Sequence, residues 1–267
     1  MREKEGLHFL KRRGIIEITG ICTVIVIWQL IASFIVKKTY LLPSPYEVFL
    51  AFLNYKVREV IPEDIYVSLL HFGIGLGAGA VVGISVGALM GGFKLADKAI
   101  DPIMEILRAI PPIAWIPFAI IWLKLTPYSA GFVVFIGAVF PILINTYTGF
   151  KSVDKIYIDA AKVLGCKKGT TLIKSVVLPY SLPYIAAGTR IGMGIGWMCV
   201  VAAEMFGASG EVGLGWRLWN RFYMLHAMDK LVAYMIIIGL IALLLDRIFR
   251  YFVEERSLKW RKGMVAV

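Results

Sequence analysis

YVSLLHFGIGLGAGAVVGISVGALMGGF, residues 66–93, contains no Asp, Glu, Lys or Arg. It is long enough to cross a bilayer as one helix, which takes about 20 apolar residues. Every fourth residue over most of its length is a glycine: Gly75, Gly79, Gly83, Gly87 and Gly91. In lipid, small residues at this spacing form a groove that lets two helix backbones approach closely. Residues 183–206 repeat the pattern with Gly188, Gly192 and Gly196. The glycines therefore predict packing surfaces in a bundle of helices, rather than ligand sites or a lone anchor helix.

The composition extends this prediction to the whole chain. Of its 267 residues, 59% are apolar and 18% charged, and the mean hydropathy is +0.76. Soluble domains are roughly 45–50% apolar and about 25% charged. The apolar residues come in long runs, so we expect an all-α, polytopic membrane helix bundle of about six transmembrane helices. The expected spans are Ile15–Val36, Tyr66–Phe93, Ile103–Lys124, Pro127–Phe150, Pro183–Phe206 and Leu231–Val253.

The basic residues indicate the orientation. The net charge is +11, and Lys and Arg gather before the first span, between the second and third, between the fourth and fifth, and after the sixth. An even number of spans puts all four segments on one side, and the positive-inside rule makes that side the cytoplasm. The expected domains are a cytoplasmic N-terminal segment, a transmembrane domain containing a cytoplasmic loop, and a cytoplasmic tail, at residues 1–14, 15–253 (loop 151–182) and 254–267. The chain is thus expected in the plasma or inner membrane, with both termini cytoplasmic.

The first apolar run is not expected to be a signal peptide. The apolar part of a signal peptide is about 7–15 residues long and precedes a cleavage site of small residues. The run Ile15–Val36 is longer and is followed by Lys37 and Lys38. We therefore interpret it as a retained transmembrane helix. Further on, Ser44-Pro45-Tyr46-Glu47 predicts the capped start of a short surface helix over residues 45–55.

Prolines interrupt the middle of the predicted bundle. Pro111, Pro112 and Pro117 fall in the third span and Pro141 in the fourth. Proline kinks a helix, and a break at membrane depth survives only against other helices or beside a cavity. A substrate pathway around spans three to five would explain them, and so would kinked packing alone. The candidate pathway or gating residues are Pro117, Pro141, Asn145 and Glu204, the last because a carboxylate in a span is costly.

The long loop between spans four and five has a helical pattern of its own. A helix is expected from Asp154 to Leu164, and Gly165 follows where a helix end favours a residue with positive φ. A second short helix is expected over residues 170–177, ended by Leu178-Pro179. The small alanines Ala160 and Ala161 and the tight turn would form a shallow knob that fits a cleft on another protein. A generic amphipathic interface helix would have the same pattern.

This loop resembles the E-A-A-x-x-x-G coupling segment of binding-protein-dependent ABC importer permeases. The matching residues are Asp159, Ala160, Ala161, Gly165, Leu178 and Pro179. Four other stretches resemble the branch for nitrate, sulfonates, taurine and bicarbonate: LPSP at 42–45, LRAIP at 107–111, FPILINT at 140–146 and VVAAEM at 200–205. Two features depart from the family pattern. Asp159 stands where glutamate is usual, and the spacing from Gly165 to Pro179 is one residue longer.

The resemblance implies a fold and a set of partners. The fold would be that of a type I ABC importer permease, and the chain would act as a homodimer. Two copies of an ABC ATPase subunit would dock on the coupling loop, and an extracytoplasmic substrate-binding protein would deliver a small anionic solute (a sulfonate, taurine or a nitrate-like compound). The chain has no G-x-x-x-x-G-K-[S/T] phosphate loop, so it is not expected to be an enzyme.

Other functions find less support in the sequence. The basic charge shows no nucleic-acid-binding motif beside it. The three cysteines and three histidines are scattered without ligand spacing, so neither a metal site nor a cofactor is expected. A secondary transporter or channel is the alternative function, but such proteins often contain internal repeats, and none is evident here. A structural scaffold would not need the proline-broken spans.

Overall fold

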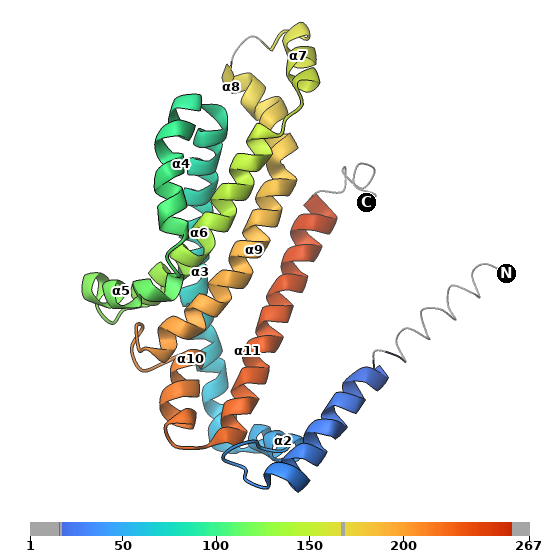
Figure 1. The fold of residues 1–267 in the computed structure, drawn as a ribbon, viewed down its shortest axis with the longest axis vertical. Helices are drawn as coiled ribbons and strands as arrows, with labels where there is room; N and C mark the ends of the chain where they lie inside the picture. Colours follow the sequence, from blue (N-terminus) through green and yellow to red (C-terminus); the bar gives the residue numbers. More distant parts are fainter. Residues whose placement is uncertain (1–15, 17, 167–168, 258–267) are drawn as a thin grey trace, which may run out of the picture. The chain divides into compact units, whose positions relative to one another are not determined.

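The computed structural model describes residues 16, 18–166 and 169–257, and the regular structure in these residues is entirely helical (Figure 1). The chain divides into two compact units, Met1–Pro62 with Leu218–Ile237 and Glu63–Arg217 with Ile238–Val267. We describe each unit by itself. The expected segment 1–14, the start of the first span at Ile15, and residues 258–267 of the tail lie outside the described residues.

Five helices in the described part of the chain are long and apolar enough to cross a membrane. They are Ile18–Val36, Val57–Gly92, Pro127–Lys151, Gly169–Met205 and Met228–Val253. A bent pair of helices, Lys94–Arg108 and Pro112–Leu123, supplies a sixth crossing if it counts as one span. The prediction of an all-α, polytopic bundle of about six spans is therefore confirmed.

The third expected span, Ile103–Lys124, is not one helix. Helix α4 (Lys94–Arg108) ends at Ala109, and a turn of 3-10 helix (Pro112–Trp115) leads into α5 (Ile116–Leu123), bent by 90° from α4. Two successive prolines, Pro111 and Pro112, lack the N–H groups that would continue the α4 ladder, and Pro111 has an extended ψ of 134°. With eight residues, α5 is about 12 Å long and too short to cross a bilayer alone.

The larger unit contains α3 (Tyr55–Gly92) from Glu63 onward, together with α6 (Pro127–Lys151) and α9 (Leu178–Met205). The α3 glycines meet α6 at every turn. A Cβ atom built on Gly79 would lie 3.1 Å from Cβ of Ala138, and one on Gly87 would lie 2.6 Å from the carbonyl oxygen of Leu143. The five glycines of α3 face, in order, Val134, Ala138, Ile142, Thr146 and Phe150, which are also four residues apart. Each of these glycines of α3 therefore contacts one of these residues of α6, in the same order along both helices.

Helix α9 covers another side of α6 by the same means. A Cβ on Gly188 would lie 2.6 Å from Cβ of Asn145, and one on Gly192 would lie 2.9 Å from the carbonyl oxygen of Ala138. A Cβ on Gly196 would lie 3.1 Å from Val134. Helix α6 therefore lies between α3 and α9, which explains why 61% of its apolar window is buried, the largest share among the five long spans.

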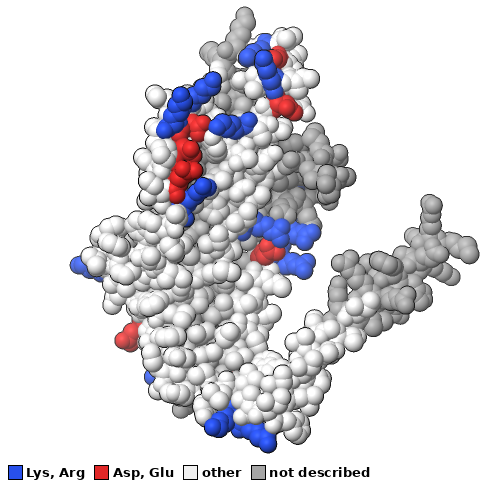
Figure 2. All heavy atoms as spheres, viewed as in Figure 1, with Lys and Arg blue, Asp and Glu red and all other residues white. Residues whose placement is uncertain are grey.

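The remaining elements of the larger unit are short or terminal. Helix α7 (Lys155–Val163), α8 (Gly169–Leu172) and a π-helical turn (Ile173–Val177) precede α9, and α10 (Leu214–Trp216) follows it. Helix α11 (Met228–Phe249) enters this unit at Ile238 and continues as π-helix (Arg250–Ser257). The Trp197 Nε1–H of α9 donates to the carbonyl of Ile238 at 3.2 Å. Charged side chains gather over α4 and the nearby end of α6 (Figure 2).

The smaller unit is built around helix α2 (Pro45–Leu53). Val48 and Ala51 pack against Ala233 of α11, with Trp28, Phe52 and Val232 around them. The first span ends in π-helix (Ile31–Val36), and a second π-helical stretch (Arg217–Tyr223) begins at the unit boundary. The capping box expected at Ser44 is confirmed, because Ser44 Oγ accepts from Glu47 N at 3.3 Å and Ser44 N donates to Glu47 Oε2 at 2.7 Å. The helix ends two residues earlier than expected, because Asn54 is extended.

The capping box gives a pH-dependent prediction. The Ser44 N–H bond and the Thr39 hydroxyl bond lower the pKa of Glu47 below its usual 4.5. A carboxyl group whose pKa is lowered by folding stabilises the folded chain at pH values above its pKa in the unfolded chain. This stabilisation is lost as the pH falls through the pKa of the group in the folded chain. We expect Ser44→Ala to cost about 1 kcal/mol at pH 7. We also expect the difference in melting temperature between wild type and Glu47→Gln to shrink between pH 6 and pH 3.5. A difference that stays constant over this range would contradict the assignment.

Candidate functional site

The predicted coupling loop forms a separate helical knob. Helix α7 ends in a Schellman motif, in which Gly165 N donates to the carbonyl of Lys162 at 3.1 Å and Cys166 N donates to Ala161 at 3.0 Å. Gly165 has φ +93°, which other residues rarely adopt. A Cβ at Gly165 would have no atom within 4 Å, so conformation and not space requires glycine here.

The knob exposes large apolar side chains beside its charged ones. Val163 is 87% exposed, Leu164 88% and Ile156 72%, although no lipid-spanning helix contains them. Asp159 and Ala160 are also exposed, whereas Ala161 is buried. Asp159 lies 3.5 Å from Lys162 of the same helix. Large exposed apolar side chains outside the candidate membrane spans favour a contact with another protein.

The end of the loop differs from expectation. Leu178 and Pro179 do not end a second helix, because residues 169–205 form one continuous helix. Leu178 N donates to the carbonyl of Ile173, five residues back, which is the bond of a π turn. The wider turn joins α8 to α9, and Pro179 occupies the first turn of α9, where its missing N–H is tolerated.

The four candidate pathway residues do not form one site. Pro141 and Asn145 lie together, since Asn145 Nδ2 donates to the Pro141 carbonyl at 2.9 Å and both meet α9 at Gly188. Pro117 lies in the first turn of α5. Glu204 is 16 residues beyond Gly188 on α9, about 24 Å along the helix. A pathway role for each stays a prediction.

Glu204 is the centre of a buried polar cluster. Its side chain is 0% exposed. Ser68 Oγ and Gly215 N donate to Oε2 at 2.8 and 2.9 Å, and His71 Nδ1 lies 2.8 Å from Oε1. The φ of Gly213 is +124°, and a Cβ there would lie 2.6 Å from Glu204 Cδ, so Gly213 must be glycine for both reasons.

A second carboxylate, Asp64, extends the cluster. Arg217 donates to both of its oxygens, from Nε at 2.8 Å and from Nη2 at 2.9 Å. Gly213 N donates to Asp64 Oδ1 at 3.4 Å, and Leu214 N to Ser68 Oγ at 2.9 Å. We call Asp64, Ser68, His71 and Glu204 the clamp, and residues 207–217 the clamped segment.

Sequence reasoning identified Glu204 but missed its partners. Asp64, Ser68 and His71 are four and three residues apart, a spacing that puts them on one face of a helix. The same face continues as Gly75 and Gly79. Polar residues at helical spacing next to the glycine ridge were the signal that could have identified the clamp on α3. The contribution of residues 213–217 required the tertiary structure, because they are far from α3 in sequence.

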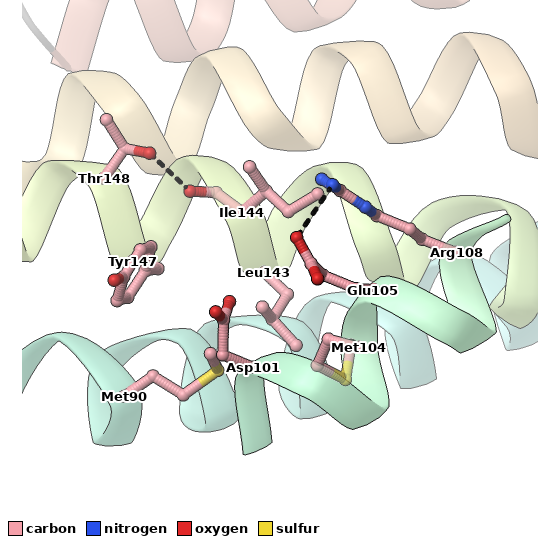
Figure 3. Close-up of a pocket in the computed structure, with 9 residues that line it drawn as sticks. All are labelled: Met90, Asp101, Met104, Glu105, Arg108, Leu143, Ile144, Tyr147 and Thr148. Atoms are coloured by element: carbon pink, nitrogen blue, oxygen red, sulfur yellow. Dashed lines mark hydrogen bonds and ion pairs between the residues drawn. The ribbon is translucent and has the colours of Figure 1, made fainter. Parts of the chain in front are cut away.

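Two further features lie outside the clamp: a cavity beside α4 and α6, and an ion pair between α9 and α11. A cavity of about 140 Å³ lies between the ends of α3, α4 and α6 (Figure 3). Glu105 and Arg108 face each other at its rim, 3.7 Å apart and both exposed. On α9, Arg190 donates to Asp246 of α11 from two of its guanidinium nitrogens, Nε at 2.7 Å and Nη2 at 3.0 Å. The described residues contain no group of three or more metal-ligating side chains that could hold an ion.

Comparison with known proteins gives matches along nearly the whole chain. Residues 79–257 match the family described as "Binding-protein-dependent transport system inner membrane component". A putative ABC transporter permease protein of Methanocaldococcus jannaschii is 40% identical, with 99% of each chain covered. The nitrate import permease protein NrtB of Synechocystis sp. is 36% identical over 95% of this chain and 93% of its own. The bicarbonate transport system permease protein CmpB of the same organism is 36% identical over 90% and 89%.

A solved structure supports the fold independently. The inward-facing MetNI methionine ABC transporter contains a chain that matches with a TM-score of 0.58. The match covers 74% of this chain and 98% of that chain, at 23% identity. At this identity the likeness concerns the fold alone, which is that of a type I ABC importer permease.

Proposed function

Because the chain belongs to the family of binding-protein-dependent transport system inner membrane components and is the multi-pass permease of an ABC importer, we propose that it carries a small inorganic or sulfonate anion into the cell. An extracytoplasmic binding protein would deliver the anion, and a separate ATPase would drive the cycle. The chain itself is a transport permease and not a catalytic enzyme. Its belonging to this family excludes the secondary transporter or channel considered from the sequence.

The exposed knob at α7 is the observation that supports the ATPase site best. Its apolar residues Ile156, Val163 and Leu164 lie outside the spans, and the Schellman turn at Gly165 holds their backbone in one shape. We propose that Asp159, Ala160, Ala161 and Gly165 present this knob to a cleft on the ATPase. The positive-inside rule places it in the cytoplasm with both chain termini.

The proposed anion class is supported by two relatives and by the negative charge of the solutes for which they are named. Two relatives at 36% identity are named for nitrate and bicarbonate import. Both are small, planar anions, and a sulfonate such as taurine's shares the charge. We propose that two copies of the chain form a homodimer. One copy of the ATPase would bind each permease copy.

The first experiment is co-purification of the tagged chain from gentle detergent. We expect an ATPase subunit to accompany the wild type and to be lost from Gly165→Val, because a β-branched residue is strained at φ +93°. Gly165→Asn is the matched control, since Asn tolerates positive φ and should keep the ATPase bound. Loss from both variants, or retention in both, would contradict the role given to the turn.

The second step identifies the anion class. The complex is reconstituted with the binding protein, and ATP hydrolysis is measured with nitrate, bicarbonate and taurine in turn. Stimulation by one of these solutes supports the proposal. Stimulation only by solutes that carry no anionic group would overturn the anion assignment, while the ATPase docking result would still stand.

A further inference from the structure

We propose that the clamped segment, residues 207–217, is a gate at the outer end of the permease, and that Asp64, Ser68, His71 and Glu204 hold it shut. The inference rests on the proposed function, because the orientation with both termini in the cytoplasm puts the start of α3 and the end of α9 on the outer side. It assigns a function to four buried polar side chains that the coupling mechanism does not use.

The clamp holds the segment by its backbone. Three successive amides, those of Gly213, Leu214 and Gly215, donate to Asp64, Ser68 and Glu204 respectively. Four hydrogen bonds tie the segment to Asp64 and Ser68 of α3, two of them from the Arg217 guanidinium. Because the accepting groups are side chains of two different helices, closing the segment also joins the outer ends of α3 and α9.

The segment also has the features of an element that can move. After α9 ends, Gly207 and Gly210 have φ of +73° and +96°, and a Cβ on either would have no atom within 4 Å. These two glycines are therefore free of packing, in contrast to Gly213, which is pressed against Glu204. The open glycines precede the clamped residues, as expected for a hinge followed by a latch.

Closure has a cost that opening removes. The Ser209 hydroxyl is buried and has no hydrogen-bond partner among the described residues, which disfavours the closed segment. Asp64 and Glu204 are both 0% exposed, and buried carboxylates are stable only while their partners remain in place. The closed state thus depends on the whole set of hydrogen bonds, and loss of one member should shift the equilibrium toward the open state.

The test measures access to residue 209 with a membrane-impermeant maleimide. Ser209→Cys is made in a chain whose Cys22, Cys166 and Cys199 are replaced by alanine, and the complex is reconstituted with its ATPase. We expect slow labelling at rest and labelling at least about tenfold faster in the ATP–vanadate state, which corresponds to about 1.4 kcal/mol. Adding Glu204→Gln, which keeps the shape but removes an acceptor charge, should make labelling fast at rest. Adding Asp246→Asn, outside the clamp, should not.

Controls separate the gate from the coupling mechanism. Glu211→Cys, in the same segment but already exposed, should react quickly in every state and shows that the reagent reaches this side. Equal labelling of Ser209→Cys in the resting and trapped states, in a complex that hydrolyses ATP, would overturn the gate. An unchanged resting rate with Glu204→Gln would overturn the clamp. Failure of any ATPase to associate would overturn the proposed function instead, and the comparison without nucleotide would still decide on the clamp.

Discussion

Replacing Gly87 by alanine is expected to destabilise the permease by about 3 kcal/mol, the upper end of the range for overpacked cores. A Cβ at this position would lie 2.6 Å from the carbonyl oxygen of Leu143 and 2.8 Å from Cβ of Thr146. The nearest atom belongs to the backbone of α6 and cannot rotate away, so α3 and α6 must separate. The gain in helix propensity from Gly to Ala is about 1 kcal/mol and cannot offset this cost. The effect is measured as the melting temperature of the purified chain, with size-exclusion chromatography used to monitor the loss of folded protein on heating.

The same helix provides the control. Gly77 lies on the opposite side of α3, is exposed, and would have no atom within 4 Å of an added Cβ. Gly77→Ala should leave the melting temperature unchanged or raise it slightly. Adding Thr146→Ala to Gly87→Ala should not restore stability, because the Leu143 carbonyl remains. Equal melting of the two single variants would show that the glycines are not packing positions.

The second large effect is expected at the Asp64–Arg217 pair. Arg217→Met removes the guanidinium from a carboxylate that is 0% exposed, and breaking a buried pair costs about 3–5 kcal/mol. The double variant Asp64→Asn, Arg217→Met should be more stable than Arg217→Met alone, since the uncompensated charge is then absent. Thermal melting of the wild type, the single variants Asp64→Asn and Arg217→Met, and the double variant gives the coupling energy of the pair.

The Arg190–Asp246 pair is the matched comparison. Its two nitrogen–oxygen bonds, at 2.7 and 3.0 Å, have nearly the same lengths as those of Arg217, but its side chains are 37% and 41% exposed. Asp246 lies in the last turn of α11 and both side chains are partly exposed, so the coupling there should be at most about 1 kcal/mol. A coupling as large as that of Asp64 and Arg217 would mean that burial does not decide the strength of these pairs.

The bundle could be predicted from sequence because its signals are local. Length and hydropathy identify a span without reference to its neighbours, and the glycine spacing shows which face of α3 is bare. The capping box at Ser44 and the turn at Gly165 are also local, since each depends on the conformation of a few consecutive residues. These features appear in the structure at the expected positions.

The errors have physical causes. Hydropathy averages over a window, so it did not detect that Pro111-Pro112 bends the third span by 90°. Leu178-Pro179 resembled a helix end because the π turn at Ile173–Val177, which carries the helix through, leaves no mark in composition. The bond from Asn145 to Pro141 is local to α6, but the contact of both residues with Gly188 of α9, far from Glu204, depended on which faces the helices turn to one another.

The sequence by itself determined that this chain is a helical membrane protein with close-packed spans, and it predicted a loop that resembles the coupling segment of ABC importer permeases. Those properties follow from the solubility of side chains in lipid and from short-range backbone preferences. Both depend only on the type of each residue and on its near neighbours in the sequence. Only the tertiary structure decided what surrounds Glu204. Its partners are 11 residues away at Gly215 and 133 and 136 residues away at His71 and Ser68. A buried carboxylate is stable only where such distant donors converge, and no local pattern specifies that convergence.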